Sequence, residues 1–104
     1  MLLSYGIDED NIKICATTGL VVDIKGFADA IPNEEDKINV IALRADMDGL
    51  PIPESNEGLP YRSQTKYAHM CGHDGHMANV VLVAEVLIKN RTKIPKNKTI
   101  RLLF

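Results

Sequence analysis

The chain has 104 residues, a formal net charge of −2 and a 45% share of hydrophobic residues. This length supports one domain with one modest core. No apolar run reaches the roughly 20 residues needed to cross a bilayer, and no excess of positive charge would attract nucleic acid. The first residues, Met1–Gly6, also lack the basic and apolar regions of a secretory signal. We therefore expect a cytoplasmic protein whose partners include neither membrane nor nucleic acid.

The first part of the chain predicts three strands. Ile12–Ala16 and Leu20–Lys25 are short β-branched runs joined by a turn-forming segment, which is typical of a hairpin. Cys15 in the first run is expected to be a small buried hydrophobe. Asp29–Lys37, with a proline and several acids, indicates a surface turn. Ile38–Leu43 is almost continuously apolar, which favours a central strand covered on both faces.

The second part predicts a helix followed by a strand. Apolar residues recur at the spacing of one helix face over Gly75–Asn90, namely Met77, Val80, Val81, Ala84, Leu87 and Ile88. Asp74 is the expected N-cap, and Thr99–Phe104 is typical of a buried strand. The order strand, helix, strand indicates a right-handed parallel crossover. We therefore predict an α/β fold, a partial mixed sheet with a parallel β-α-β crossover.

A connection of about 30 residues separates Leu43 from this helix, far more than the usual ~2–6 residues. It begins with Asp46 and Asp48 and ends with the histidine-rich run His69–His76. Ligands of open α/β sheets bind beyond the carboxyl ends of the strands. Both polar clusters are therefore expected to lie along one cleft.

The run His69–His76 contains every histidine of the chain and one of its two cysteines. Cys71 and His73 are one residue apart, so both could reach one metal ion or two adjacent ions. Thiolate and imidazole suit Zn²⁺ and bind Mn²⁺, Co²⁺ or Ni²⁺ less selectively. His76 is expected on the helix surface, and the role of His69 stays open.

Asp46 and Asp48 alternate along an extended segment, so both are expected on one face, with Met47 opposite. A carboxylate behind a metal-bound imidazole fixes the tautomer of the ring. The alternative is a simple turn, since Asp48-Gly49 followed by Leu-Pro is good turn chemistry. Arg44 could neutralise these carboxylates.

Three motifs of this chain carry a family resemblance. They are Ile-Ala-Leu-Arg-Ala-Asp-Met-Asp-Gly-Leu-Pro-Ile (41–52), Leu-Pro-Tyr-Arg-Ser (59–63) and His-Met-Cys-Gly-His-Asp-Gly-His-Met-Ala (69–78). In order and spacing they resemble the metal-dependent amidohydrolases of the aminoacylase and carboxypeptidase metallopeptidase group. That group includes hippurate hydrolase, N-acyl-amino-acid amidohydrolases and auxin–amino-acid conjugate hydrolases. The resemblance covers about Leu2 to Phe104.

The resemblance implies a centre of two divalent metal ions, zinc or manganese, in a zinc-exopeptidase-like domain. Cys71 and His73 would be metal ligands and Asp48 the catalytic carboxylate that orients the site, while Asp46 is not assigned. The substrate would be a small N-acyl amino acid, hydrolysed at its amide bond, and the complete enzyme could be a homodimer. Residues 1–104 would form the N-terminal part of the catalytic domain. The general base, further ligands and a lid or dimerisation domain would lie elsewhere, so this chain alone is expected to be inactive.

Two other functions are consistent with the same residues. One is a small non-catalytic metal-binding or interaction domain that retains the motifs. The other is a cysteine hydrolase in which Cys71 is paired with His69, His73 or His76, although neighbours so close in sequence rarely reach the geometry of a nucleophile and its base.

Overall fold

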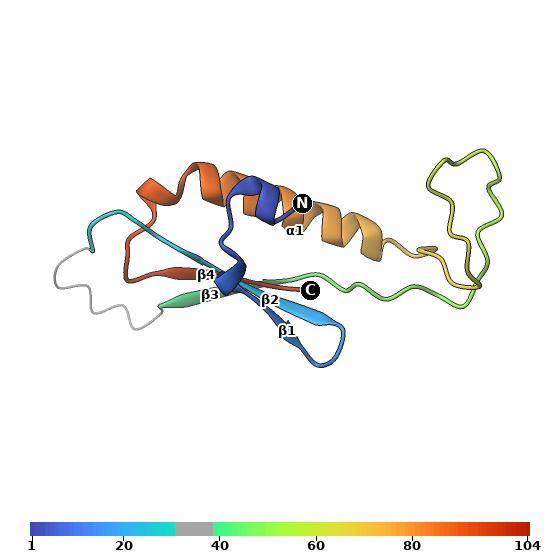
Figure 1. The fold of residues 1–104 in the computed structure, drawn as a ribbon, viewed down its shortest axis with the longest axis horizontal. Helices are drawn as coiled ribbons and strands as arrows, with labels where there is room; N and C mark the ends of the chain where they lie inside the picture. The colour runs from blue at the N-terminus through green and yellow to red at the C-terminus, as the bar shows by residue number, and fades with distance from the viewer. Residues whose placement is uncertain (31–38) are drawn as a thin grey trace.

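Four strands form one mixed sheet, and a long helix runs along one face of it (Figure 1). The structure is a computed structural model that describes residues 1–30 and 39–104. The strands are β1 (Ile12–Cys15), β2 (Gly19–Lys25), β3 (Val40–Arg44) and β4 (Thr99–Leu103), in the sheet order β1-β2-β4-β3. The helix is α1 (His73–Lys89), and the short 3-10 turns are η1 (Leu3–Tyr5), η2 (Glu9–Asn11) and η3 (Arg91–Lys93).

The predicted hairpin is confirmed, since β1 pairs antiparallel with β2 from Ile12 opposite Val22 to Cys15 opposite Gly19. Its turn places Ala16 and Thr17 at positive φ, which non-glycine residues rarely adopt. The expectation for Cys15 is wrong, because its side chain is exposed. β1 is an edge strand, and three of its four residues, Cys15 included, face solvent.

The predicted parallel crossover is also confirmed. β3 and β4 pair in parallel, from Val40 opposite Thr99 to Arg44 opposite Leu103, and α1 lies between them in the chain. The central position expected for β3 is wrong: β4 inserts between β2 and β3, so β3 lies at the edge with all five residues exposed. The apolar sequence of β3 predicts that the strand is buried, but the described strands and helix do not cover it. The predicted surface turn over Asp29–Lys37 lies almost entirely outside the described residues.

The core lies between the sheet and α1. Val22 and Ile24 of β2 and Leu102 of β4 are buried against Val80 and Ala84 of the helix. These are helix positions that the apolar spacing predicted. Within residues 1–30 and 39–104, no helix is both long and apolar enough to cross a membrane.

The helix begins two residues earlier than predicted. Gly72 is its N-cap, with φ of 137°, and Asp74 lies in the first turn without making a side-chain capping bond. The prediction of Asp74 as the N-cap is therefore wrong. Gly72 occupies a backbone conformation that a residue with a Cβ would rarely adopt, so the helix can start sharply after Cys71. His73 becomes its first residue.

The sheet face opposite α1 carries an ion pair between neighbouring strands. Asp23 and Arg101 are register partners, and Nε and Nη2 of Arg101 donate to the two carboxylate oxygens of Asp23 at 2.7 and 2.8 Å. These hydrogen bonds lower the pKa of Asp23 from 3.8, against the opposing effect of burial. The two strands β2 and β4 are therefore joined here by a side-chain ion pair in addition to their backbone hydrogen bonds.

We predict that Arg101→Met lowers the urea midpoint of unfolding at neutral pH, and that this effect fades in acid. Because the folded state lowers the pKa of Asp23, the stabilisation is complete above 3.8 and is lost as pH falls through the folded value. Urea titrations of both proteins across this range check the prediction. Lys96→Met is the control, because it removes a cation from an exposed ion pair, in which Nζ of Lys96 lies 3.6 Å from Oδ1 of Asp29. A difference that persists at about pH 2 would contradict the role of Asp23.

Candidate metal centre

The candidate site forms where the chain leaves β3 beneath the start of α1. Ala45 follows the strand, is 2% exposed, and donates its backbone N–H to the carbonyl of Leu103 at 2.9 Å. The chain is therefore still anchored to β4 when it reaches Asp46 and Asp48. Asp46 and Asp48 therefore follow the carboxyl end of a parallel strand, which is where the cleft was predicted.

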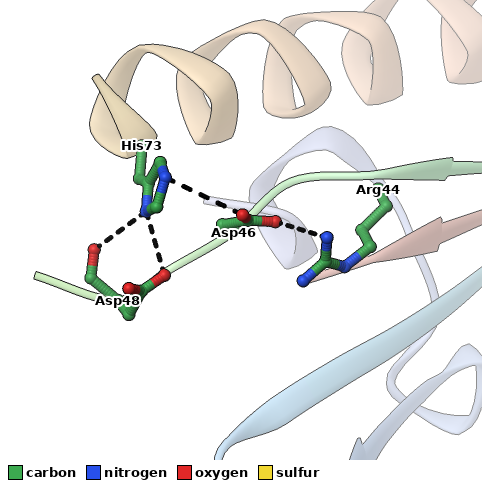
Figure 2. A network of polar contacts seen from close by, with 4 residues as sticks. All are labelled: Arg44, Asp46, Asp48 and His73. Carbon is green, nitrogen blue, oxygen red and sulfur yellow. Dashed lines mark hydrogen bonds and ion pairs between the residues drawn. The ribbon is translucent and has the colours of Figure 1, made fainter. Parts of the chain in front are cut away.

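Figure 2 shows the His73 ring between these two aspartates. Nδ1 of His73 lies 2.9 Å from Oδ1 of Asp48 and 3.3 Å from the Asp48 backbone carbonyl. Nε2 lies 3.7 Å from Oδ2 of Asp46. As predicted from their alternation, the two carboxylates therefore face one common group. His73 is partly buried, with 23% of its side chain exposed.

The second oxygen of Asp46 is held by an arginine. Nη1 of Arg44 lies 2.8 Å from Oδ1 of Asp46 (Figure 2). The Arg44 side chain is 71% exposed, so the pair adds little stability, but it fixes the orientation of the Asp46 carboxylate. The expectation that Arg44 neutralises a nearby carboxylate is met at Asp46.

The donor set fits a divalent cation. Two acceptors at Nδ1 favour the tautomer that carries its proton on that nitrogen, which leaves the lone pair of Nε2 facing the Asp46 carboxylate. Two electron-rich groups facing each other are stabilised by a cation between them. Ligand atoms of Asp46, Asp48 and His73 all lie within 4.8 Å of one another. Asp46, left unassigned by sequence reasoning, is thus a candidate ligand, and its alternation with Asp48 was the available signal.

The predicted ligand Cys71 lies at the edge of this group. Its thiol is free and exposed, and it lines a small cavity together with Asp48, His69 and His73. Cys71 is not part of the three-residue cluster of potential ligand atoms found in the described part of the chain. Among residues 1–30 and 39–104, no hydrogen bond joins the Cys71 thiol to a histidine.

The other two histidines differ in position. His76 is exposed on the first turn of α1, as expected, and its ring centroid lies 5.5 Å from that of His73. His69 lines the small cavity beside Cys71 and also a larger one next to it. Sequence reasoning missed that second cavity.

The larger cavity has a volume of about 610 Å³. Most of its lining residues belong to residues 50–68, which form a projecting loop that we term the arm (Figure 1). Leu50 and Ala68 close the arm by exchanging two backbone hydrogen bonds, at 2.9 and 3.0 Å. The cavity is lined by Gly49, Glu54, Leu59, Tyr61, Ser63, Tyr67, Ala68, His69 and Asp74. Two tyrosines in a loop without periodicity were the signal that could have indicated it.

Comparison with known proteins agrees with the resemblance read from the motifs. The family described as Peptidase family M20/M25/M40 matches residues 42–104, which is more than half of the chain. N-acetyl-L-cysteine deacetylase of Bacillus subtilis is 43% identical over 102 residues, covering 94% of this chain and 22% of the relative. Thermostable carboxypeptidase 1 of Saccharolobus solfataricus is 46% identical over 65 residues, covering 62% of this chain and 16% of the relative.

A solved structure shares the fold. A dinuclear metal binding peptidase of the M20 family from Bacillus subtilis matches 99% of this chain with a TM-score of 0.69 and 33% sequence identity. The match covers 27% of that protein. The chain thus spans about a quarter of the length of such relatives, and its partial mixed sheet corresponds to part of their fold.

We predict that Asp48→Asn shifts the His73 ring toward the tautomer protonated at Nε2. The neutral amide is a weaker acceptor than the carboxylate that now lies 2.9 Å from Nδ1. Nitrogen-15 NMR of the metal-free protein at about pH 8 measures the two tautomers. Asp46→Asn is the matched control, because its carboxylate lies 3.7 Å from the other ring nitrogen. An equal shift in both variants would exclude a specific role for Asp48.

Proposed function

We infer the function of this chain from the premise that it belongs to peptidase family M20/M25/M40. We propose that it forms the N-terminal part of the catalytic domain of a metal-dependent amidohydrolase. The observation that carries this proposal is the His73 imidazole held between two carboxylates at the carboxyl end of β3, beside the Cys71 thiol. The complete enzyme would hydrolyse the amide bond of N-acyl amino acids.

Cys71 and His73 are the proposed ligands, and Asp46 is a further candidate. A pair of divalent ions, when bound, would polarise the amide carbonyl and lower the pKa of an attacking water toward about 7. Zinc and manganese are the ions we propose, given a thiolate, an imidazole and carboxylates as donors. The name of the structural relative, a dinuclear metal binding peptidase, supports the count of two ions.

The residues of this chain would act mainly by orientation. Asp48 accepts the Nδ1 proton of His73, which fixes the tautomer of the ring and directs Nε2 into the site. Arg44 holds one oxygen of Asp46 so that the other points toward the same nitrogen. These contacts fix the His73 ring before any substrate arrives.

The substrate class rests on the relatives and on the motifs. One relative is named for the deacetylation of N-acetyl-L-cysteine, which is an N-acyl amino acid, and another is named a carboxypeptidase. Both names describe hydrolysis of an amide bond. The cytoplasmic location and the homodimeric state expected from the sequence are part of the same proposal.

We predict that metal affinity of the full-length enzyme falls strongly in Cys71→Ala and His73→Ala. Loss of a residue behind a ligand already costs roughly 10-fold or more, and loss of a ligand exceeds that. Metal per chain after dialysis against limiting chelator is the measurement. His76→Ala is the control, because His76 lies one helical turn away and is exposed. Equal metal content in all three variants would contradict the assignment.

We predict further that a full-length enzyme containing this chain releases free amino acid from N-acetyl amino acids, while residues 1–104 alone do not. Water activation needs fully coordinated ions and a base within about 3 Å of the water. The four side chains gathered here are too few to complete two metal sites. Both proteins are assayed with zinc or manganese, with and without chelator. Turnover by residues 1–104 that Cys71→Ala abolishes would refute the partial-site proposal, and metal binding without turnover at full length would favour the non-catalytic alternative.

A further inference from the structure

We propose that the cavity lined by the arm binds the acyl group of the substrate, and that Tyr61 and Tyr67 select apolar or aromatic acyl groups. This inference rests on the proposed amidohydrolase function. Its volume of about 610 Å³ lies within the range of roughly 300–1,000 Å³ that is typical of ligand pockets. The cavity is therefore large enough for a benzoyl or longer acyl chain.

The cavity adjoins the candidate metal centre. Gly49 and Asp74 line it, and they are the immediate neighbours of Asp48 and His73 in the chain. His69 lines both this cavity and the small one that Cys71 and His73 share. A substrate whose amide carbonyl reached His73 would thus extend one of its two ends into the cavity.

Two tyrosines, Tyr61 and Tyr67, line the cavity. Tyr61 is 79% exposed and Tyr67 is 49% exposed, although each ring could bury a large apolar area. Leu59 also lines the cavity and offers a third apolar side chain. Exposed rings that line a concave surface next to a catalytic centre are well suited to cover an apolar ligand.

Charge decides which end of the substrate enters. Glu54 and Asp74 line the cavity, and among the described residues that line it there is neither lysine nor arginine. An N-acyl amino acid carries its carboxylate on the amino-acid side of the scissile amide, and two acids would repel that group. In N-acetyl and N-benzoyl amino acids the acyl group carries no charge. The cavity therefore favours the acyl group.

The arm is organised before a ligand binds. Nε of Arg62 donates to the carbonyl of Glu54 at 2.9 Å across the arm. The hydroxyls of Ser63 and Thr65 both donate to the carbonyl of Tyr67, which fixes the turn that carries this tyrosine. The pocket wall is thus preorganised, which reduces the entropic cost of ordering it around a ligand.

The test compares kcat/KM for N-benzoyl and N-acetyl forms of one amino acid in the full-length enzyme. We expect Tyr61→Ala and Tyr67→Ala to lower the benzoyl-to-acetyl ratio by about tenfold, as loss of apolar contact in a specificity pocket does. Tyr5→Ala is the matched control, because Tyr5 belongs to η1 and does not line the cavity. Metal content should not change in any of the three variants.

Glu54→Gln tests the charge argument independently. It should raise kcat/KM for an N-succinyl amino acid relative to the N-acetyl form several-fold, because one repulsive carboxylate is removed. Unchanged acyl ratios in the tyrosine variants and in Glu54→Gln, in an enzyme that still hydrolyses N-acetyl amino acids, would overturn this inference alone. An enzyme that binds metal and hydrolyses none of these substrates would instead overturn the proposed function.

Discussion

The parallel pairing of β3 with β4 is the constraint on which the site depends. It carries the chain in hydrogen-bonded register from Val40 to Arg44, and the bond from Ala45 to Leu103 extends that register by one residue. Since Ala45 is also buried in the core, the segment that follows has little freedom in direction. The two aspartates are thus placed by backbone bonds and apolar packing formed without them.

The other half of the site depends on where α1 begins. Because Gly72 accepts a φ of 137°, the helix starts at once after the cysteine, and His73 stands in its first turn above Asp48. Packing of Val80 and Ala84 against the sheet then fixes the distance between that turn and the sheet. An earlier or later start would move the imidazole away from both carboxylates, so the conformation of Gly72 sets the position of His73 relative to Asp48.

Much of this could be predicted from sequence, and the failures have physical causes. Periodicity reports which face of an element is apolar, so the hairpin, the face of α1 carrying Val80 and Ala84, and the parallel crossover were predictable. Periodicity does not report which strand lies beside which, so the apolar β3 was expected in the centre and lies at the edge. The prediction of the N-cap was wrong because it relied on side-chain preference, which favours Asp74. The backbone conformation found at the cap, with φ of 137°, is one that Gly72 can adopt. The alternation of Asp46 and Asp48 predicted that both lie on one face. The distance of each carboxylate from His73 could not be predicted, because it depends on how β3 and α1 are placed in the fold.

The network around His73 also shows how the two aspartates can differ in role despite equal chemistry. Asp48 contacts Nδ1 with both its carboxylate and its backbone carbonyl, so it is the acceptor of a ring proton. Asp46 is farther from the ring, and Arg44 holds its Oδ1 while its Oδ2 faces Nε2 of the imidazole. A cation entering between Nε2 and Asp46 would therefore meet one neutral and one negative donor already aimed at it, while the net charge of the Asp46 and Arg44 pair stays near zero. This balance lowers the repulsion that two unpaired carboxylates would impose on each other on either side of the His73 ring.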